Sequence, residues 1–370
     1  MLSRLKLRHF RNYEALDVSF DNGLTVLTGE NGQGKSNLLE AIHYLSLLRS
    51  FRTRRISDLC HWDRSYFFLE GLLRETPGTS LSRRMSVTYA GERRLKIDGM
   101  RIRRASEFIN TFLCVAFVPE DIQLIHGPPA ERRRFTDIVL SQGKAEYLAQ
   151  RIQYRVAIKA RNTAIRQSAK YGSKTVNAFS HAVAHHGAYI TAARKSFIEH
   201  FNTLLERRAP QLFSDGHTVR CEYSSNALRH LTGSVSQAAI QETLEELLDK
   251  EIKYAKNGDE RTTRAGPHRD DIILYLDDRR VDVFGSEGQA RLMSLLMRLA
   301  SIDILEELSD DRPIVALVDD VLGELDIVRR AAFMKTIATV GQVFLAATEI
   351  PEEVKNRTSQ VFRITAGDLV

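Results

Sequence analysis

The chain has 370 residues, 43% of them hydrophobic and 27% charged, with 53 Lys and Arg against 47 Asp and Glu. This length and apolar content can fill the core of two domains, or of one domain with a large insertion, and they exclude disorder over the whole chain. The formal net charge of +6 favours an anionic partner without identifying it. The opening residues lack the apolar core of a signal peptide, and no window approaches 18 consecutive apolar residues, so we expect a cytoplasmic protein.

Strand patterns dominate the first third of the chain. The short apolar runs between Leu2 and Phe20 predict two strands joined by a turn at Arg11 and Asn12, and a third strand covers Leu24 to Thr28. Leucines and isoleucines at helical spacing then predict a helix from Ser36 to Leu48. Four β-type segments between about 66 and 118 (YFFLEGLL, RMSVTYA, RLKIDG and LCVAFV) predict a small antiparallel sheet.

The middle of the chain is helical in pattern. From about 129 to 212 glycine is scarce and apolar residues recur every three or four positions. The C-terminal third again has alternating strand and helix patterns, with the strand IILYL, a helix over about 288 to 308, and the apolar runs IVALV and VFLAAT. We therefore expect one α/β head made of residues 1–125 and 256–370, interrupted by a helical lobe or arm at 126–255.

Residues 29–36 read GENGQGKS and match G-x-x-x-x-G-K-[ST] between a predicted strand and a predicted helix. We call this segment the P-loop. Its glycines let backbone amides wrap around phosphates at a helix N-terminus, Lys35 adds charge between the β and γ phosphates, and Ser36 supplies a hydroxyl to Mg²⁺. The predicted ATP-binding residues are Gly29, Glu30, Asn31, Gly32, Gln33, Gly34, Lys35, Ser36 and Asn37.

An apolar strand that ends in acid is the expected second half of such a site, and IVALVDD at 314–320 provides it. Asp319 at the strand end is placed to hold Mg²⁺, together with Ser36. Asp320 could polarise the attacking water as a general base. Asp319, Asp320 and Lys35 are thus the predicted catalytic residues.

A third segment narrows the class of ATPase. FGSEGQAR at 284–291, called the signature segment below, precedes a long predicted helix and places Ser286 at its start. Taken alone, Ser286 with Gly288 is an ordinary helix N-cap. The order P-loop, signature segment, DD and then GELD at 323–326 resembles the ABC-type ATPase heads of chromosome-maintenance proteins.

That resemblance implies an ABC-type P-loop head in which ATP joins two subunits. The signature residues Ser286, Gly288 and Gln289 of one subunit would contact the γ-phosphate held by the other, in a nucleotide-dependent homodimer. Asp326 would lie in the loop that crosses the dimer interface, and Thr348 would be the switch residue that senses the γ-phosphate. Two departures, Asp320 in place of the commoner Glu and Glu287 in place of a second signature glycine, suit slow hydrolysis.

Nearly the whole chain is similar to one branch of these ATPases. HFRNYE at 9–14, GPPAERRRF at 127–135 and AGPHRDDI at 265–272 resemble the RecF family, and the insertion is too short for the long coiled coils of other branches. The resemblance implies a DNA-binding clamp of DNA repair, replication and recombination, with slow, DNA-stimulated ATPase activity. It also implies RecO and RecR as partners, with RecA downstream. The glutamine-loop position falls at 118–124, where Glu120 and Gln123 both remain candidates.

The predicted arm carries the sharpest charge asymmetry in the sequence. Residues 151–200 contain nine Lys or Arg and one acid, Glu199. A basic helix face suits a phosphate backbone, with affinity that falls steeply as salt rises, although such a face can also be merely solvated. The predicted DNA contacts are Arg151, Arg155, Lys159, Arg161 and Arg166.

Three other classes stay open at this point. A transporter's ATPase subunit shares the motif order but not the arm. A P-loop kinase or GTPase would turn over a small substrate, yet it would not need Ser286, and no N-K-x-D motif occurs. An ATPase-coupled nuclease would need a dense carboxylate cluster, for which Asp270, Asp271, Asp277 and Asp278 are a weak case.

No metal centre is indicated outside the ATP site. Cys60, Cys114 and Cys221 lie far apart, so neither a disulfide framework nor a zinc site is expected. His268 has no second His or Cys at ligand spacing, and we expect it to make structural hydrogen bonds.

Overall fold

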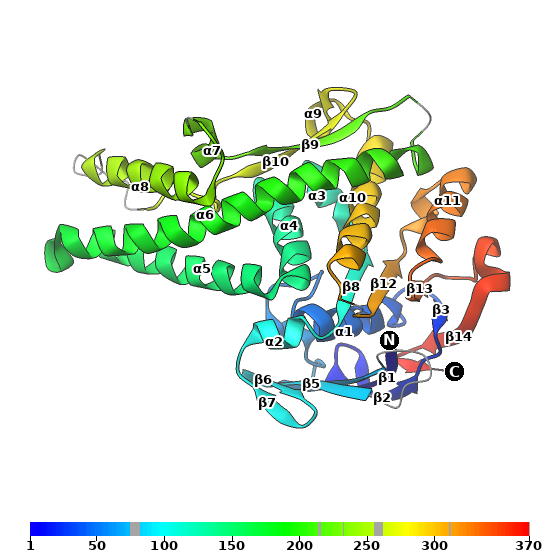
Figure 1. Cartoon of the computed structure of the whole chain (residues 1–370). Coiled ribbons are helices and arrows are strands. Elements are labelled where there is room, and N and C mark those ends of the chain that lie inside the picture. The colour runs from blue at the N-terminus through cyan, green and yellow to red at the C-terminus, as the bar shows by residue number, and fades with distance from the viewer. Residues whose placement is uncertain (75–81, 214–215, 232, 255–261, 311, 370) are drawn as a thin grey trace. The chain divides into compact units, whose positions relative to one another are not determined.

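The computed structural model describes the chain except for residues 75–81, 214–215, 232, 255–261, 311 and 370, and except for the side chains of 168–174 and 253–254. It divides into two compact units (Figure 1). Unit 1 comprises Met1–Ile122, Arg208–Asp215 and Arg291–Val370, and unit 2 comprises Gln123–Arg207 and Gly216–Ala290. The first division lies close to the boundary expected at 125, whereas unit 2 continues well beyond the expected boundary at 255 and 256.

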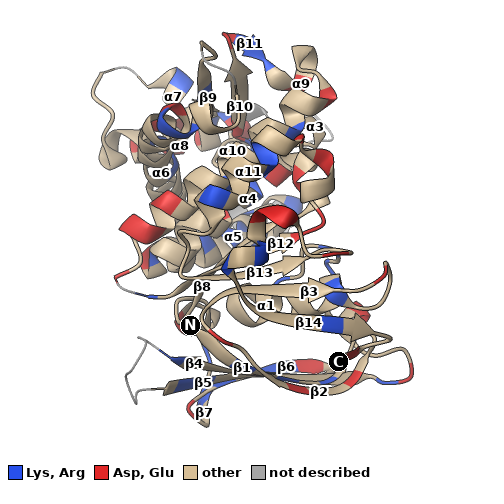
Figure 2. Cartoon of the chain, turned by 90° about the vertical axis from the view of Figure 1, so that its right-hand side faces the viewer, with Lys and Arg blue, Asp and Glu red and all other residues tan. Residues whose placement is uncertain are grey.

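Unit 1 contains two sheets with the helix α1 (Lys35–Leu47) between them (Figure 2). One is a six-stranded antiparallel sheet in the order β2-β1-β4-β5-β6-β7. Its strands are β1 (Leu2–Phe10), β2 (Tyr13–Ser19), β4 (Tyr66–Arg74), β5 (Ser82–Ala90), β6 (Glu92–Ile97) and β7 (Met100–Ile102). The first two strands and their turn are as predicted from the sequence, and they extend the small sheet that we expected from later segments alone.

The second sheet of unit 1 carries the nucleotide motifs. Its order is β15-β14-β3-β13-β12-β8, and its strands are parallel except for the antiparallel pair β14 and β15. Their bounds are β3 (Gly23–Thr28), β8 (Leu113–Phe117), β12 (Ile314–Asp319), β13 (Gln342–Ala346), β14 (Thr358–Thr365) and β15 (Asp368–Leu369). Parallel strands covered on both faces are apolar throughout, and β8, β12 and β13 are buried at every position.

The position of β8 corrects the prediction for LCVAFV. We expected this segment in the antiparallel sheet, but it pairs in parallel with β12. Its five consecutive buried residues lack the alternation of a strand with one solvated face, and this lack is the signal that distinguishes it from β4.

Helix α1 follows β3 as the sequence predicted. Leu38, Leu39, Ile42 and Leu45 are fully buried, because strands of both sheets contact the helix. Leu48 ends the helix in the left-handed conformation, with φ of 53°. The other helices assigned wholly to unit 1 include α2 (Ala105–Ile109) and α11 (Ile327–Ile337).

Unit 2 combines the predicted helices with a small sheet. Its helices are α3 (Gln123–His126), α4 (Pro129–Gly143), α5 (Ala145–Arg166), α7 (Asn226–His230), α8 (Gln237–Tyr254), α9 (Val281–Phe284) and all but the last residue of α6 (Ser168–Arg208). Strands β9 (Val219–Ser224), β10 (Asp271–Leu276) and β11 (Arg279–Arg280) form a three-stranded antiparallel sheet. The segment IILYL therefore belongs to unit 2 and not to the sheet of the head, and its alternating burial is that of a half-solvated strand.

A buried polar network holds three of the unit 2 helices together. Asp137 of α4 accepts hydrogen bonds from Tyr147 of α5 at 2.6 Å and from Arg194 of α6 at 2.7 Å, and Arg151 of α5 donates to its second oxygen at 2.7 Å. Burial acts to raise the pKa of the Asp137 carboxyl, but Arg194 and Arg151 outweigh it, so the pKa lies below its ordinary value.

Candidate ATP site and nucleic-acid surface

The P-loop begins where β3 ends and runs directly into α1, so its amides gather at a helix N-terminus. Gly34 caps that helix with φ of 119°, a conformation that favours glycine. A Cβ at Gly34 would come within 2.6 Å of the Asn12 amide nitrogen. Both the dihedral angle and the close approach explain why the loop requires glycine here.

The ammonium group of Lys35 lies over its own loop. Its Nζ donates to the carbonyls of Gly29 at 2.6 Å and Glu30 at 2.8 Å, and the residue is buried. Burial lowers the pKa of Lys35, while the carboxylates of Asp320 and Asp319 act in the opposite direction. Lys35 therefore presents a partly desolvated cation beside the P-loop backbone, which suits a phosphate.

The structure brings the two halves of the predicted site together. Ser36 Oγ donates to Asp319 Oδ1 at 2.8 Å, although the residues are 283 positions apart in sequence. The contact arises because β3 and β12 are parallel strands separated by β13, so their carboxyl ends meet at one edge of the sheet. Burial raises the pKa of Asp319, and Glu120 contributes in the same direction against the Ser36 hydrogen bond.

Three further residues lie at the same sheet edge. Glu120 follows β8, Asp320 follows β12, and Thr348 follows β13, and all three are exposed. Asp320 adopts a left-handed backbone with φ of 53°, which turns the chain sharply at the strand end. Gln123, the second candidate for the glutamine loop, is assigned to unit 2, whereas Glu120 contributes to the electrostatics of Asp319 in unit 1.

The turn between β1 and β2 braces the P-loop, which the sequence patterns alone did not reveal. Asn12 donates to the Gln33 carbonyl at 3.0 Å and accepts from Asn37 at 2.7 Å, and Tyr13 Oη donates to the Gly34 carbonyl at 3.0 Å. Arg52 donates to the Asn37 side chain at 2.8 Å. The available signal was the HFRNYE segment, which the sequence analysis used only for its family resemblance.

The signature segment, apart from Arg291, is assigned to unit 2 and lies at the start of α10 (Glu287–Glu307), a helix whose later residues are assigned to unit 1. The Gln289 amide donates to Ser286 Oγ at 3.2 Å, and the Ser286 amide donates to Gln289 Oε1 at 2.8 Å. This is a reciprocal capping box, so the ordinary N-cap role of Ser286 is real. Ser286 is also exposed, and a Cβ at Gly288 would meet nothing within 4 Å in the described structure.

Asp326 has a local structural role as well. It caps α11, where its side chain accepts from the Arg329 amide at 2.9 Å and pairs with the Arg329 guanidinium at 2.6 Å. The backbone hydrogen bond from Arg329 is the main reason that the pKa of Asp326 is lowered. The adjoining residues Ile327 and Val328 are 76% and 78% exposed, so the start of this helix presents apolar side chains to solvent.

The predicted DNA-binding residues of α5 divide into three groups. Arg161 is fully buried, where it donates to Ser180 at 2.9 Å, Thr263 at 2.8 Å and Glu251 at 3.0 Å, so its prediction as a DNA contact is wrong. Arg151 is largely engaged with Asp137. Exposed cationic side chains remain at three positions, namely Arg155, Lys159 and Arg166.

Other titratable groups have structural surroundings. His268 bonds to Tyr154 Oη at 2.6 Å and to the Thr263 carbonyl at 3.0 Å, as expected for a structural histidine. Burial lowers its pKa to about 4. The three cysteines are free and buried. In the described parts of the chain, no group of three or more His, Cys, Asp or Glu is placed to hold a metal, and no helix there is long and apolar enough to span a bilayer.

Comparison with known proteins places these features in one family. Residues 1–368 match the family described as RecF/RecN/SMC N terminal domain. The chain is 33% identical to the DNA replication and repair protein RecF of Latilactobacillus sakei over 381 residues, covering 100% of this chain and 98% of that one. It is also 33% identical to the RecF of Streptococcus suis over 372 residues, covering 99% and 98%.

Solved structures of RecF proteins are also similar to the chain over its whole length. A structure of the recombination mediator protein RecF-ATP in the RecFOR pathway superposes with a TM-score of 0.89 at 28% identity, covering 100% of this chain and 96% of that one. A RecF-ATPrS structure gives a TM-score of 0.85 at the same identity, covering 100% and 97%. The predicted fold class is thereby confirmed: a mixed α/β ATPase head with antiparallel and parallel sheets and an inserted helical region. The chain belongs to the RecF family.

Proposed function

We propose that the protein is an ATP-dependent DNA-binding clamp that acts in recombinational repair and replication-fork maintenance. The observation that carries the proposal is the 2.8 Å contact between Ser36 and Asp319, which joins the P-loop to the acidic strand end at one edge of the sheet. That contact supports a nucleotide site in which phosphate-binding and cation-binding groups act together. The RecF-ATP relative supports ATP as the nucleotide.

Residues 29–37 hold the nucleotide in this proposal. The P-loop amides bind the phosphates, and Lys35 neutralises charge between the β and γ groups. The hydroxyl of Ser36 and the carboxylate of Asp319 are oxygen donors of the type that Mg²⁺ prefers, and they lie within hydrogen-bond distance of each other. When bound, Mg²⁺ would neutralise charge that develops on the phosphates.

Hydrolysis serves as a slow switch. Asp320 orients the attacking water and accepts its proton, and Thr348 senses the γ-phosphate from the end of β13. Asp320 is exposed, and its side chain is shorter than that of Glu, so it holds the water less firmly. We therefore expect slow, DNA-stimulated ATPase activity.

Dimerisation depends on the signature segment. ATP bound to one subunit is contacted by Ser286, Gly288 and Gln289 of a second copy, and Asp326 lies in the loop that crosses the interface. The exposure of Ser286 and the open space at Gly288 support this assignment, because the fold itself does not require glycine there. The capping box holds the Ser286 hydroxyl at a helix start, where anions are favoured.

The closed dimer binds duplex or gapped DNA, with Arg155, Lys159 and Arg166 as backbone contacts on the arm and Arg151 as a weaker candidate. Such contacts fix the position of DNA without reading its sequence. The RecFOR pathway named for the related structures supports RecO and RecR as partners. Loading of RecA downstream follows from the family resemblance alone. The similarity to a bacterial DNA replication and repair protein supports a cytoplasmic location.

Two substitutions should separate ATP binding from ATP-dependent dimerisation. Lys35→Ala should abolish ATP binding and, with it, ATP-dependent DNA binding. Ser286→Arg should keep ATP affinity but lose dimerisation, because the longer cation blocks the γ-phosphate contact in the second copy. Ser234→Arg is the matched control, since Ser234 is also exposed in unit 2 and the charge change is the same. Nucleotide affinity and sedimentation would be measured for each, and a Ser286→Arg protein that still dimerises with ATP would refute the model.

A further inference from the structure

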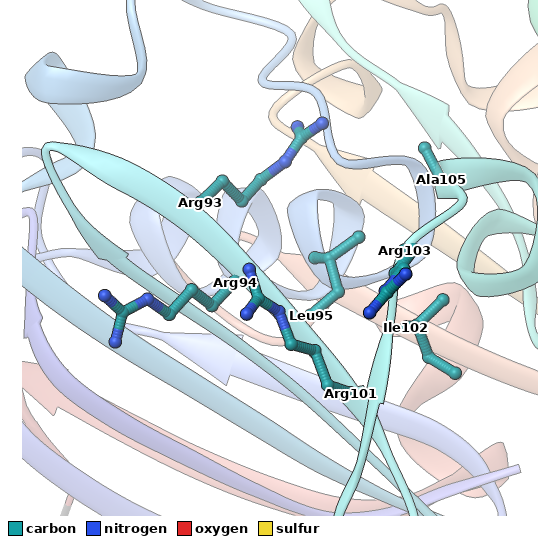
Figure 3. Close-up of a pocket in the computed structure, with 7 residues that line it drawn as sticks. All are labelled: Arg93, Arg94, Leu95, Arg101, Ile102, Arg103 and Ala105. Carbon is teal, nitrogen blue, oxygen red and sulfur yellow. The ribbon is translucent and has the colours of Figure 1, made fainter.

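The edge of the antiparallel sheet in unit 1 carries a cluster of arginines outside the ATP site. Strands β6 and β7 form a hairpin, and the residues around it line a cavity of about 400 Å³ (Figure 3). Those residues are Arg93, Arg94, Leu95, Arg101, Ile102, Arg103 and Ala105. No carboxylate is among them. We call this the β6–β7 arginine pocket.

Strand register assigns the cations to faces of the sheet. Leu95 is buried and stands opposite Ile102, so this pair belongs to the face that packs on the core. Side chains alternate along a strand, which puts Arg94, Lys96 and Arg101 on the solvent face. Figure 3 shows Arg93 and Arg94, adjacent in β6, extending in different directions, as this alternation requires.

The arrangement is unfavourable for the sheet by itself. Lys96 and Arg101 are directly opposite each other across the β6 and β7 pair, at a position where like charges destabilise a sheet. Packing of their aliphatic stems does not explain why Lys96 and Arg101 stand here, because both side chains are exposed. A bound anion would remove this repulsion, whereas the fold alone gains nothing from it.

The pocket cations also differ from cations elsewhere on the same sheet. Arg4 and Lys6 share Asp17, with contacts of 2.6 and 3.2 Å. Among the described residues, by contrast, the side chains of Arg94, Arg101 and Arg103 have no hydrogen-bond or ion-pair partner. Guanidinium groups only donate hydrogen bonds, so a ligand that satisfies them must bring acceptors.

From these features we infer that the β6–β7 arginine pocket binds the phosphodiester backbone of DNA. Several guanidinium groups along one hairpin match a ligand with a row of anions, and forked donors suit phosphate oxygens. The pocket lining offers no aromatic ring to stack on a base. The contact is therefore independent of sequence and adds a backbone site in unit 1 to the one proposed on the arm. This inference rests on the proposed function, because it assumes that the protein binds DNA.

The test compares two double variants with equal charge change on one sheet. Arg94→Gln/Arg101→Gln removes two unpaired cations, and Arg4→Gln/Lys6→Gln removes two cations that Asp17 already neutralises. Binding of a fluorescent duplex is measured with Mg-ATP at several salt concentrations. Loss of two phosphate contacts should lower the magnitude of the slope of log affinity against log salt by about 2. The ratio of the unmodified protein's DNA affinity to that of the variant should therefore fall about tenfold between about 50 and about 200 mM salt.

The control should change the slope by less than about 1. Arg94→Lys/Arg101→Lys should restore most of the slope, because lysine keeps the charge. If the glutamine variant folds poorly, arginine modification by phenylglyoxal on the unmodified protein gives a second measurement, in which bound duplex should protect Arg94, Arg101 and Arg103.

The outcomes separate this inference from the proposed function. If the unmodified protein binds no DNA with Mg-ATP, both are overturned. If it binds DNA while Arg94→Gln/Arg101→Gln keeps the full salt slope, or the three arginines stay unprotected, only the pocket assignment is overturned. An unchanged DNA slope combined with lost binding of a poly-glutamate peptide would assign the pocket to an acidic protein partner instead.

Discussion

Two arginine-rich regions of the molecule, helix α5 and the β6–β7 hairpin, look alike in sequence and differ in structure. In α5, Arg161 is fully buried against Glu251, and Arg151 is bonded to Asp137. In the hairpin, the side chains of Arg94 and Arg101 have no partner within the described chain. The first region uses part of its charge to hold helices together, while the second leaves its charge open to a ligand.

This difference teaches that a count of cations does not locate an anion-binding surface. A guanidinium that already donates to carboxylates is a structural element, and removing it should mainly lower stability. A guanidinium without a partner adds little to stability, and removing it should mainly lower affinity for an anion. Substitutions in the two regions should therefore change different quantities, namely unfolding free energy in one and affinity for DNA in the other.

Arg161→Met should cause the largest change, in stability. It removes the Arg161 hydrogen bonds to Glu251, Thr263 and the Leu248 carbonyl, and breaking a buried ion pair in this way costs about 3–5 kcal/mol of unfolding free energy. Arg155→Met on the same helix is the control, with an expected change within about 0.5 kcal/mol. Urea denaturation measures both. A stable Arg161→Met protein with a reduced salt slope for DNA would return Arg161 to the DNA surface.

Asp137→Asn should show that the α4, α5 and α6 network depends on pH. Its removal leaves Arg194 and Arg151 unpaired and should lower the unfolding free energy by about 3 kcal/mol at neutral pH. Because the folded pKa of Asp137 lies below the unfolded value of about 3.9, its stabilisation is present above about pH 4 and is lost as pH falls through the folded pKa. The stability difference from the unmodified protein should therefore shrink on acidification, and a constant difference between pH 7 and pH 3 would contradict this role.

Arg155→Gln/Lys159→Gln should act on DNA binding and leave stability nearly unchanged. Both side chains are exposed. If the arm contacts the phosphate backbone, the salt slope should fall by up to about 2 while ATP affinity stays the same. An unchanged slope would leave the hairpin as the favoured surface.

Asp17→Asn should give the smallest effect, in the opposite direction. It releases Arg4 and Lys6 on the sheet that carries the hairpin, and loss of this exposed pair should cost no more than about 1 kcal/mol. If unpaired cations on this sheet attract DNA, affinity should rise slightly and the salt slope should steepen by less than about 1. Weaker DNA binding would contradict the idea that unpaired cations on this sheet attract DNA.

The meeting of Ser36 and Asp319 was predictable because each lies in a motif that is local in sequence. The hydroxyl and the carboxylate each follow a strand pattern, and parallel strands bring their carboxyl ends to one edge of the sheet. Sequence periodicity also predicted whether nearly every named segment is a helix or a strand, and it predicted the turn at Arg11 and Asn12. It could not assign LCVAFV to a sheet, because pairing partners far away in sequence decide between a covered and a half-solvated strand.

The basic surface was less predictable for a related reason. Helical spacing put Arg161 near Arg151 and Arg155, but its burial depends on Glu251 and Thr263, which lie far along the chain. Likewise, the bracing of the P-loop by Asn12 depends on where a distant turn packs. Partners that are remote in sequence leave no periodic signal, so pairing had to be seen in the structure.

If ATP joins two heads into a DNA-binding clamp, light scattering should detect the change in mass. The protein would be measured with and without Mg-ATP, and the same samples would then be measured with duplex DNA. We expect the molar mass of one chain without nucleotide, the mass of two chains with Mg-ATP, and a stable complex of the dimer with duplex. A protein that keeps the mass of one chain with Mg-ATP and ignores DNA would contradict this expectation and favour a P-loop enzyme acting on a small substrate.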